Sequence, residues 1–203
     1  MPLQTLTLAN LATTFDHCIT FWHTDPSDYT GIQRELNPLA LELAWKNYSL
    51  WHEEDKARRT DVNDSMIAQV KRNIDKFNQQ RNDQIERLDE AILSWLTPQC
   101  NWTADLPINS ETPGSIVDRI SIMSLKVYHM DEDTRRDDID QEHRERSLSK
   151  LAILKEQRAD LEQALQRLLG EYLAGTRRMK LYRQFKMYND PTLNPELYRQ
   201  NKA

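Results

Sequence analysis

Apolar residues recur between positions 67 and 95 at alternating steps of three and four residues. The positions that share this stripe are Ile67, Val70, Ile74, Phe77, Ile85, Leu88, Ile92 and Trp95. Because this spacing keeps side chains on one face of an α-helix, it predicts an amphipathic helix of about 30 residues. A helix of that length needs a neighbouring helix along its apolar face.

Four further segments carry helical signals. A first helix is predicted over residues 8–23, and a second over residues 38–59, where Pro38 suits the first helical turn. Thr112 and Pro113 predict the start of a fourth helix, which reaches about Met130. Six leucines between Leu148 and Leu168 predict a long fifth helix.

These helices indicate an all-α fold, a single-domain helical bundle of five to six helices with two long helices. We expect residues 1–37 to form an N-terminal helix and turn, and residues 38–170 to form the core bundle. Residues 171–203 are predicted to be a basic C-terminal helix and tail. Composition agrees, since only four Gly and 29% charged residues in a chain of 203 favour long helices with few turns.

Composition and charge also narrow the function classes. No apolar run approaches the length of a membrane span and the N-terminus lacks a signal-like pattern, so we expect a cytoplasmic protein. Cys18 and Cys100 lack metal-ligand spacing and are expected to be structural thiols. The net charge of -5 argues against nucleic acid as the partner. Seven Lys or Arg residues from Thr176 onward form a basic tail that can dock on the acidic remainder.

One residue breaks the apolar stripe of the third helix. Continuing from Ile74 and Phe77, the next position on that face is Arg81. A buried guanidinium without partners costs several kcal/mol, so we expect carboxylates and amides around it. The candidates on the same helix are Asp75, Asn78, Asn82 and Glu86, and those on one face of the second helix are Asn47, Trp51, Glu54, Asp55 and Arg58.

The start of the fourth helix is a candidate anion site. The free N–H groups of a first helical turn attract anions, and here Gly114 allows close approach while Ser115 adds a hydroxyl. Asp118 and Arg119 extend this polar end, so these residues and Thr112 are predicted to bind a phosphate or carboxylate. The alternative is that Thr112 and the following proline only start a helix.

The carboxylates of this cluster suit a hard metal ion. Glu54, Asp55 and Glu86 offer the oxygen ligands that Mg²⁺ or Mn²⁺ prefers, although the sequence leaves open whether a metal binds. His52 is a candidate general base, but a histidine without a second one at helical spacing does not indicate zinc. His129 is equally ambiguous. If the protein is an enzyme, the predicted catalytic residues are Glu54, Asp55, His52 and Glu86.

Four stretches resemble one protein family in the same order and over nearly the whole chain. They are NYSLWHEEDKAR, NQQRND, ETPGSIVDRISIMSLKVYH and KLYRQFKMYNDPTLNPELY. The chain resembles the bacterial family labelled domain of unknown function 4254. This resemblance implies an all-helical fold and a context in cell-envelope sugar biosynthesis, and it supplies no catalytic assignments.

Two hypotheses of function follow. In the first, a small phosphorylated or otherwise anionic ligand, such as a nucleotide or nucleotide-sugar, binds among the second, third and fourth helices. Arg58, Arg81 and Arg119 can clamp an anion, and metal-assisted hydrolysis or transfer at phosphate is the reaction such a site favours. In the second, the protein is a non-catalytic helical scaffold with a buried ion network, whose long helices pair with another chain as in a homodimer.

Overall fold

The computed structural model describes residues 8, 10–26, 37–185, 187 and 190–199. Over these residues the chain is all-α, with a single isolated parallel bridge between Ile108 and Arg178 and no β-strand. The helices are α1 (Leu11–Thr24), α2 (Pro38–Ala57), α3 (Asp64–Leu96), the short 3-10 helix η1 (Thr97–Gln99), α4 (Pro113–Thr134), α5 (Gln141–Leu173) and α6 (Pro195–Tyr198). The predicted helical bundle is confirmed, and α3 and α5 are its two long helices with 33 residues each.

Local sequence signals fix where the helices begin. The side chains of Asn37, Asn63, Thr112 and Asp140 each accept a hydrogen bond from a backbone N–H in the first turn of α2, α3, α4 and α5, respectively. Since those N–H groups have no partner within the helix, each cap satisfies a donor that would otherwise need water. The helix starts predicted at residues 38 and 113 are confirmed. α4 continues past its predicted end at Met130 to Thr134.

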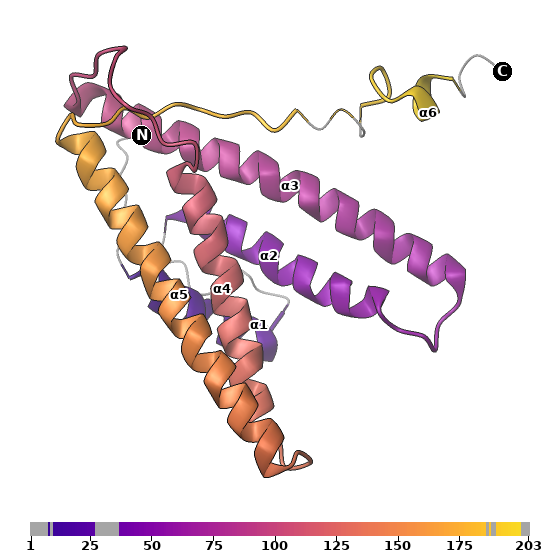
Figure 1. The fold of residues 1–203 in the computed structure, drawn as a ribbon. Helices are drawn as coiled ribbons and strands as arrows, with labels where there is room; N and C mark the ends of the chain where they lie inside the picture. Colours follow the sequence, from indigo (N-terminus) through magenta and orange to yellow (C-terminus); the bar gives the residue numbers. More distant parts are fainter. Residues whose placement is uncertain (1–7, 9, 27–36, 186, 188–189, 200–203) are drawn as a thin grey trace.

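Two antiparallel helix pairs, α2 with α3 and α4 with α5, diverge from a common base (Figure 1). The main core fills that base, where Phe15, Trp22, Leu88, Ile120 and Tyr172 are fully buried. These five side chains come from α1, α3, α4 and α5, so the core ties both pairs together. Helix α1 packs against the α4–α5 pair. Helix α4 contacts both α1 and α2.

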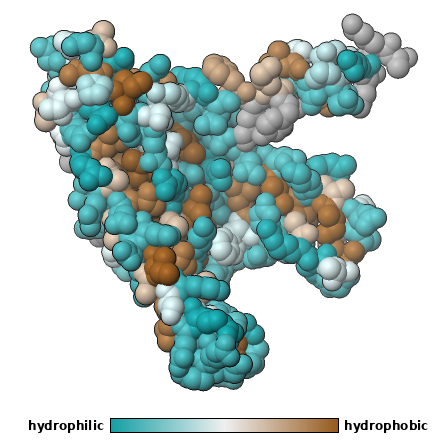
Figure 2. Space-filling view, viewed as in Figure 1, coloured by the Kyte–Doolittle hydropathy of each residue, from teal (hydrophilic) through white to brown (hydrophobic). Residues whose placement is uncertain are grey.

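A smaller apolar cluster holds the outer part of α2 against α3. It consists of Leu50, Val70 and Ile74. Further out, Glu53 accepts a hydrogen bond of 3.0 Å from Asn73, which fixes the register of the two helices. The space-filling view shows hydrophilic residues over most of the visible face, with apolar side chains exposed between the helices (Figure 2).

The basic C-terminal segment is not the short helix that the sequence predicts. After α5 the backbone forms no helix or strand from Met179 to Phe185, and its trace runs along α3 (Figure 1). Arg183 binds the carboxylates of Glu86 and Glu90, with N···O distances of 2.9 and 2.5 Å. The expected docking of basic residues on acidic surface is therefore present, but the segment that docks is not helical.

None of the helices that the structure describes is long and apolar enough to cross a lipid bilayer. Within residues 1–37, which are predicted to form an N-terminal helix and turn, residues 1–7, 9 and 27–36 lie outside the described residues.

Candidate functional site

A pocket of about 440 Å³ lies between α2, α3 and α4. Its lining contains seven of the residues that the sequence pattern predicts to share a site. The lining residues are Asn47, Leu50, Trp51, Glu54, Asp55, Arg58, Asn78, Arg81, Ile122 and Leu125. The structure thus brings together the polar face of α2 and the interrupted seam of α3, as the helical spacing predicts.

A hydrogen-bonded network forms the inner wall of this pocket. The amide nitrogen of Asn47 donates to Asp118 Oδ1 at 2.8 Å and to Ser121 Oγ at 2.6 Å. Arg81 Nε lies 3.7 Å from the same Asp118 oxygen, an ion pair beyond hydrogen-bonding distance. The expectation that Arg81 needs a carboxylate is met by Asp118 of α4, whereas Asp75 of its own helix pairs with Lys71.

Arg81 keeps unused hydrogen-bonding capacity in this network. Its Nε is buried and has no hydrogen-bond partner among the residues that the structure describes. Burial raises the pKa of Asp118, while Arg81 and Asn47 act in the opposite direction. A guanidinium that is held by one carboxylate and still has a free donor can accept a second anion.

The rim of the pocket carries charges of both signs. Arg58 donates to Glu54 Oε2 at 2.9 Å, one helical turn away, and both side chains are substantially exposed. Asp55 is exposed beside them. Because exposed pairs of this kind are weak, Arg58 is free to turn toward a ligand at little cost.

The anion at the N-terminus of α4 is a carboxylate side chain of the protein itself. Asp89 Oδ1 of α3 accepts a hydrogen bond of 2.7 Å from the backbone N–H of Gly114. Thr112 caps the helix through the N–H of Ser115, at 3.2 Å, and both Thr112 and Gly114 are buried. A carboxylate from α3 thus occupies the position that the sequence assigns to an external anion bound by Thr112, Gly114 and Ser115.

The other sequence-predicted residues lie away from the pocket. Arg119 is exposed and pairs with Glu111. Asn82 is buried but is not part of the pocket lining. Glu86 accepts hydrogen bonds from Arg183 and from the backbone N–H of Gln184, at 2.9 and 2.8 Å.

The predicted oxygen-ligand metal site of Glu54, Asp55 and Glu86 is not assembled. Glu53 lies opposite Asn73, whereas Arg87 lies opposite Glu42, so Glu86 is at the far end of the α2–α3 pair from Glu54. Helical spacing places Glu86 on the expected side of α3, but it carries no information about position along the partner helix. Glu54 and Asp55 remain together at the pocket.

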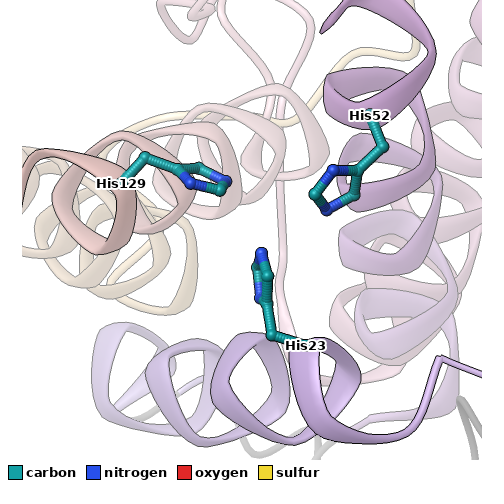
Figure 3. A group of neighbouring side chains, drawn as sticks. All are labelled: His23, His52 and His129. Atoms are coloured by element: carbon teal, nitrogen blue, oxygen red, sulfur yellow. The ribbon is translucent and has the colours of Figure 1, made fainter. Parts of the chain in front are cut away.

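A cluster of three histidines lies where α1, α2 and α4 meet, and none of the three lines the pocket. His23 of α1, His52 of α2 and His129 of α4 point toward one another (Figure 3), and their ligand-capable nitrogens all lie within 4.8 Å of one another. The ring centroids of His23 are 5.1 Å from those of both partners. All three Nε2 atoms are buried, and none has a hydrogen-bond partner within the described part of the chain.

Hydrogen bonds fix the outer nitrogen of two of these rings. His23 Nδ1 lies 2.7 Å from the carbonyl oxygen of Ile19, so Nδ1 must carry the proton and donate it. His129 Nδ1 lies 2.8 Å from Glu132 Oε2, which imposes the same tautomer on a neutral ring. Nε2 of each ring then presents a lone pair to the centre of the cluster.

Aromatic side chains hold the three rings in place. Tyr128 stacks on His23 with centroids 4.2 Å apart, and Trp51 stacks on His129 at 4.7 Å. Tyr48 packs edge-on against His52 at 4.5 Å. Burial lowers the pKa of His52 and His129, and the neighbouring His23 lowers both further. The aromatic contacts, together with the hydrogen bonds of His23 and His129, therefore restrict the orientation of the rings.

A protein-family model matches residues 37–181 of the chain. The matching family is described as Protein of unknown function (DUF4254). The chain belongs to this family. The comparison with curated proteins finds no match, and neither does the comparison with solved structures.

The DUF4254 match extends from just before α2 to the segment that follows α5. It contains the whole lining of the pocket, together with His52 and His129. His23 lies in α1, before the matched residues. The family description names no ligand or reaction, so function has to be argued from the two groups of side chains themselves.

Sequence reasoning did not find the histidine cluster. From the sequence, His52 is a candidate general base, His129 is ambiguous and His23 gives no signal, because none of them has a second histidine at helical spacing on its own helix. A spacing rule detects ligands that share one helix, whereas these three meet only through the packing of α1 and α2 against α4. Each lies next to an aromatic residue in the sequence, Trp22, Trp51 or Tyr128, but that signal is too common to identify a site.

Proposed function

We propose that the protein binds a small anionic ligand, of the phosphorylated kind found in nucleotides and nucleotide-sugars, in the pocket between α2, α3 and α4. The observation that carries this proposal is the buried, unpartnered Nε of Arg81 at the pocket wall. Leaving a guanidinium donor buried without a hydrogen bond is costly, and a phosphate oxygen is a partner that relieves the cost.

Other lining residues support a ligand of this class. Arg58 supplies a second guanidinium, and Asn47 and Asn78 supply amides. Trp51 offers an aromatic face on which a base or sugar ring can pack. The volume of about 440 Å³ lies in the range of small-molecule sites. The pocket thus combines anion-binding groups with an apolar wall of Leu50 and Leu125.

A catalytic role is the extension of this proposal that Glu54 and Asp55 support. Both carboxylates line the pocket that contains Arg81. They can hold a Mg²⁺ or Mn²⁺ ion that arrives with the phosphorylated ligand, or activate water, in a hydrolysis or transfer at phosphate. Cell-envelope sugar metabolism is the context that the family resemblance suggests for such a reaction.

The alternative is a non-catalytic scaffold, in which Arg81, Asp118 and Asn47 only fix the register of the helices. In that case α3 and α5 pair with a second copy of the chain or with another protein. Sedimentation of the purified protein measures whether a homodimer forms. Under this alternative, variants of the network lower stability and no small anion binds.

A thermal-shift experiment on the full chain separates these possibilities. The probes are inorganic phosphate, ADP and UDP-glucose, each with and without Mn²⁺. A ligand present at 100 times its Kd stabilises the folded state by about 2.7 kcal/mol, which raises the Tm visibly. We expect at least one probe to raise the Tm of the unmodified protein, and Arg81→Gln to abolish that rise.

Two further variants make the result specific. Arg72→Gln removes an exposed arginine of α3 outside the pocket and should leave the Tm rise unchanged. Glu54→Gln should keep the response to the anion and lose any additional response to Mn²⁺. If no probe shifts the Tm, or if Arg81→Gln responds like the unmodified protein, the pocket is not an anion site and the scaffold alternative takes its place.

A further inference from the structure

We propose that His23, His52 and His129 bind a divalent transition-metal ion of the zinc type at the junction of α1, α2 and α4. The proposal concerns a separate group of side chains from those that carry the anion pocket. It rests on the convergence of three imidazoles from three helices and on the state of their inner nitrogens (Figure 3).

The spacing of the nitrogens suits one shared ion. Zinc binds histidine nitrogen at 2.0–2.1 Å in a tetrahedral arrangement, which separates two nitrogens by about 3.4 Å. The ligand-capable nitrogens of the cluster lie within 4.8 Å of one another. Closing the remaining difference requires rotations about the side-chain torsions.

The hydrogen bonds of His23 and His129 place a proton on Nδ1 and leave Nε2 available to bind a metal ion. The Ile19 carbonyl fixes a proton on Nδ1 of His23, and the Glu132 carboxylate does so for His129. A ligating histidine commonly donates its second nitrogen to a carbonyl or carboxylate in this way, which orients the ring and strengthens it as a ligand. Both kinds of partner are present, and they lie on the outer side of the cluster.

Without a cation the same arrangement is unfavourable. Buried nitrogens that lack a hydrogen bond cost free energy, and here three of them face one another. A metal ion satisfies all three lone pairs at once.

The ligand type selects the metal. Imidazole nitrogen suits Zn²⁺, Cu²⁺, Ni²⁺ and Fe²⁺, whereas Mg²⁺ and Ca²⁺ prefer oxygen. Three protein ligands leave one coordination position, which catalytic zinc sites use for water or substrate. Asp55 lines the anion pocket and, together with His52, a neighbouring hollow beside α2.

Cobalt provides a spectroscopic test. The full chain, free of any affinity tag, is stripped with a chelator and titrated with Co²⁺ in buffer without phosphate. We expect stoichiometric binding, with the visible absorption of four-coordinate rather than six-coordinate Co²⁺, and displacement by Zn²⁺. His52→Gln and His129→Gln should each lose this absorption.

Controls separate ligation from general damage to the fold. His17 is exposed on the same helix as His23, so His17→Gln should bind Co²⁺ like the unmodified protein. Glu132→Gln keeps all three ligands and should weaken binding by about 10–100-fold, since it removes only an orienting partner. Far-UV circular dichroism establishes that each variant is folded.

Two results would overturn the proposal: no stoichiometric Co²⁺ or Zn²⁺ binding by the stripped protein, or four-coordinate Co²⁺ that persists in folded His52→Gln. Because the titration uses metal alone, its failure leaves the anion pocket untouched. A failure of the thermal-shift experiment with phosphate ligands likewise leaves the metal site standing.

Discussion

Asp89 Oδ1 accepts a hydrogen bond of 2.7 Å from the backbone N–H of Gly114, so a carboxylate of α3 sits at the positive end of α4. This contact joins the two helix pairs near the base of the molecule. It also explains why this helix start is unavailable to an external anion, since a charge of the right sign already occupies it.

Gly114→Ala should destabilise the protein by about 1–3 kcal/mol, the cost of overpacking a tight helix contact. A Cβ at this position would lie 2.8 Å from Asp89 Oδ1 and 2.8 Å from the backbone carbonyl oxygen of Ile85. Urea denaturation measures the change in the free energy of unfolding. The matched control is Gly170→Ala in α5, where an added Cβ meets nothing within 4 Å. That variant should be more stable by about 0.5–1 kcal/mol, because Ala favours the helix over Gly.

The ionisation of Asp89 should lower the stability of the folded protein as the pH rises. Burial, the largest cause, raises the pKa of this carboxyl from 3.8 to about 6 in the folded protein. The folded state therefore binds a proton that the unfolded state has lost, and its contribution to stability is complete below pH 3.8 and disappears as the pH passes 6. Raising the pKa of Asp89 from 3.8 to about 6 corresponds to about 3 kcal/mol of folding stability at low pH.

The variant Asp89→Asn isolates this contribution. Urea denaturation between pH 4 and pH 7 gives the free energy of unfolding for both proteins, and their difference removes the effect of every other titrating group. The unmodified protein should lose stability relative to Asp89→Asn over this interval. A relative gain would mean that the N–H donors of α4 outweigh burial and that the pKa lies below 3.8.

The two cysteines should differ in their reaction with a thiol reagent. Cys18 is buried in the core, and burial raises its pKa to about 11, whereas Cys100 is only half-buried. Because the thiolate is the reactive form, Cys100 should react with Ellman's reagent in the native protein and Cys18 only as fast as the chain unfolds. Cys100→Ser should lose the fast phase and Cys18→Ser should keep it. A fast phase that survives in Cys100→Ser would contradict the burial of Cys18.

The features that sequence predicts well here are local ones. The apolar stripe of α3, the starts of α2 and α4, and the polar face of Asn47, Trp51 and Glu54 all depend on neighbours within a few turns of one helix. The place of Arg81 on that stripe also indicated correctly that a carboxylate must face it. Which carboxylate does so depends on how helices pack, and the sequence did not identify Asp118 as that partner.

The incorrect predictions have the same cause, which is that the packing of the helices cannot be seen in the sequence. Glu86 has the right spacing from Arg81, but Arg183 approaches it from the C-terminal segment and the helix register separates it from Glu54. The histidine cluster requires three helices to pack in one particular way. Neither arrangement leaves a periodic signal in the sequence, so only the structure shows them.

The placement of α1 has a consequence for the order of folding. The α2–α3 and α4–α5 pairs are joined by short turns, residues 58–63 and 135–140, so the contacts within each pair are close in sequence and can form quickly. α1 instead joins Ala12 to Glu162 and Asp16 to Arg158, which requires closing the chain over most of its length. Because His23 lies on α1, the three imidazoles meet only once α1 has packed against α4.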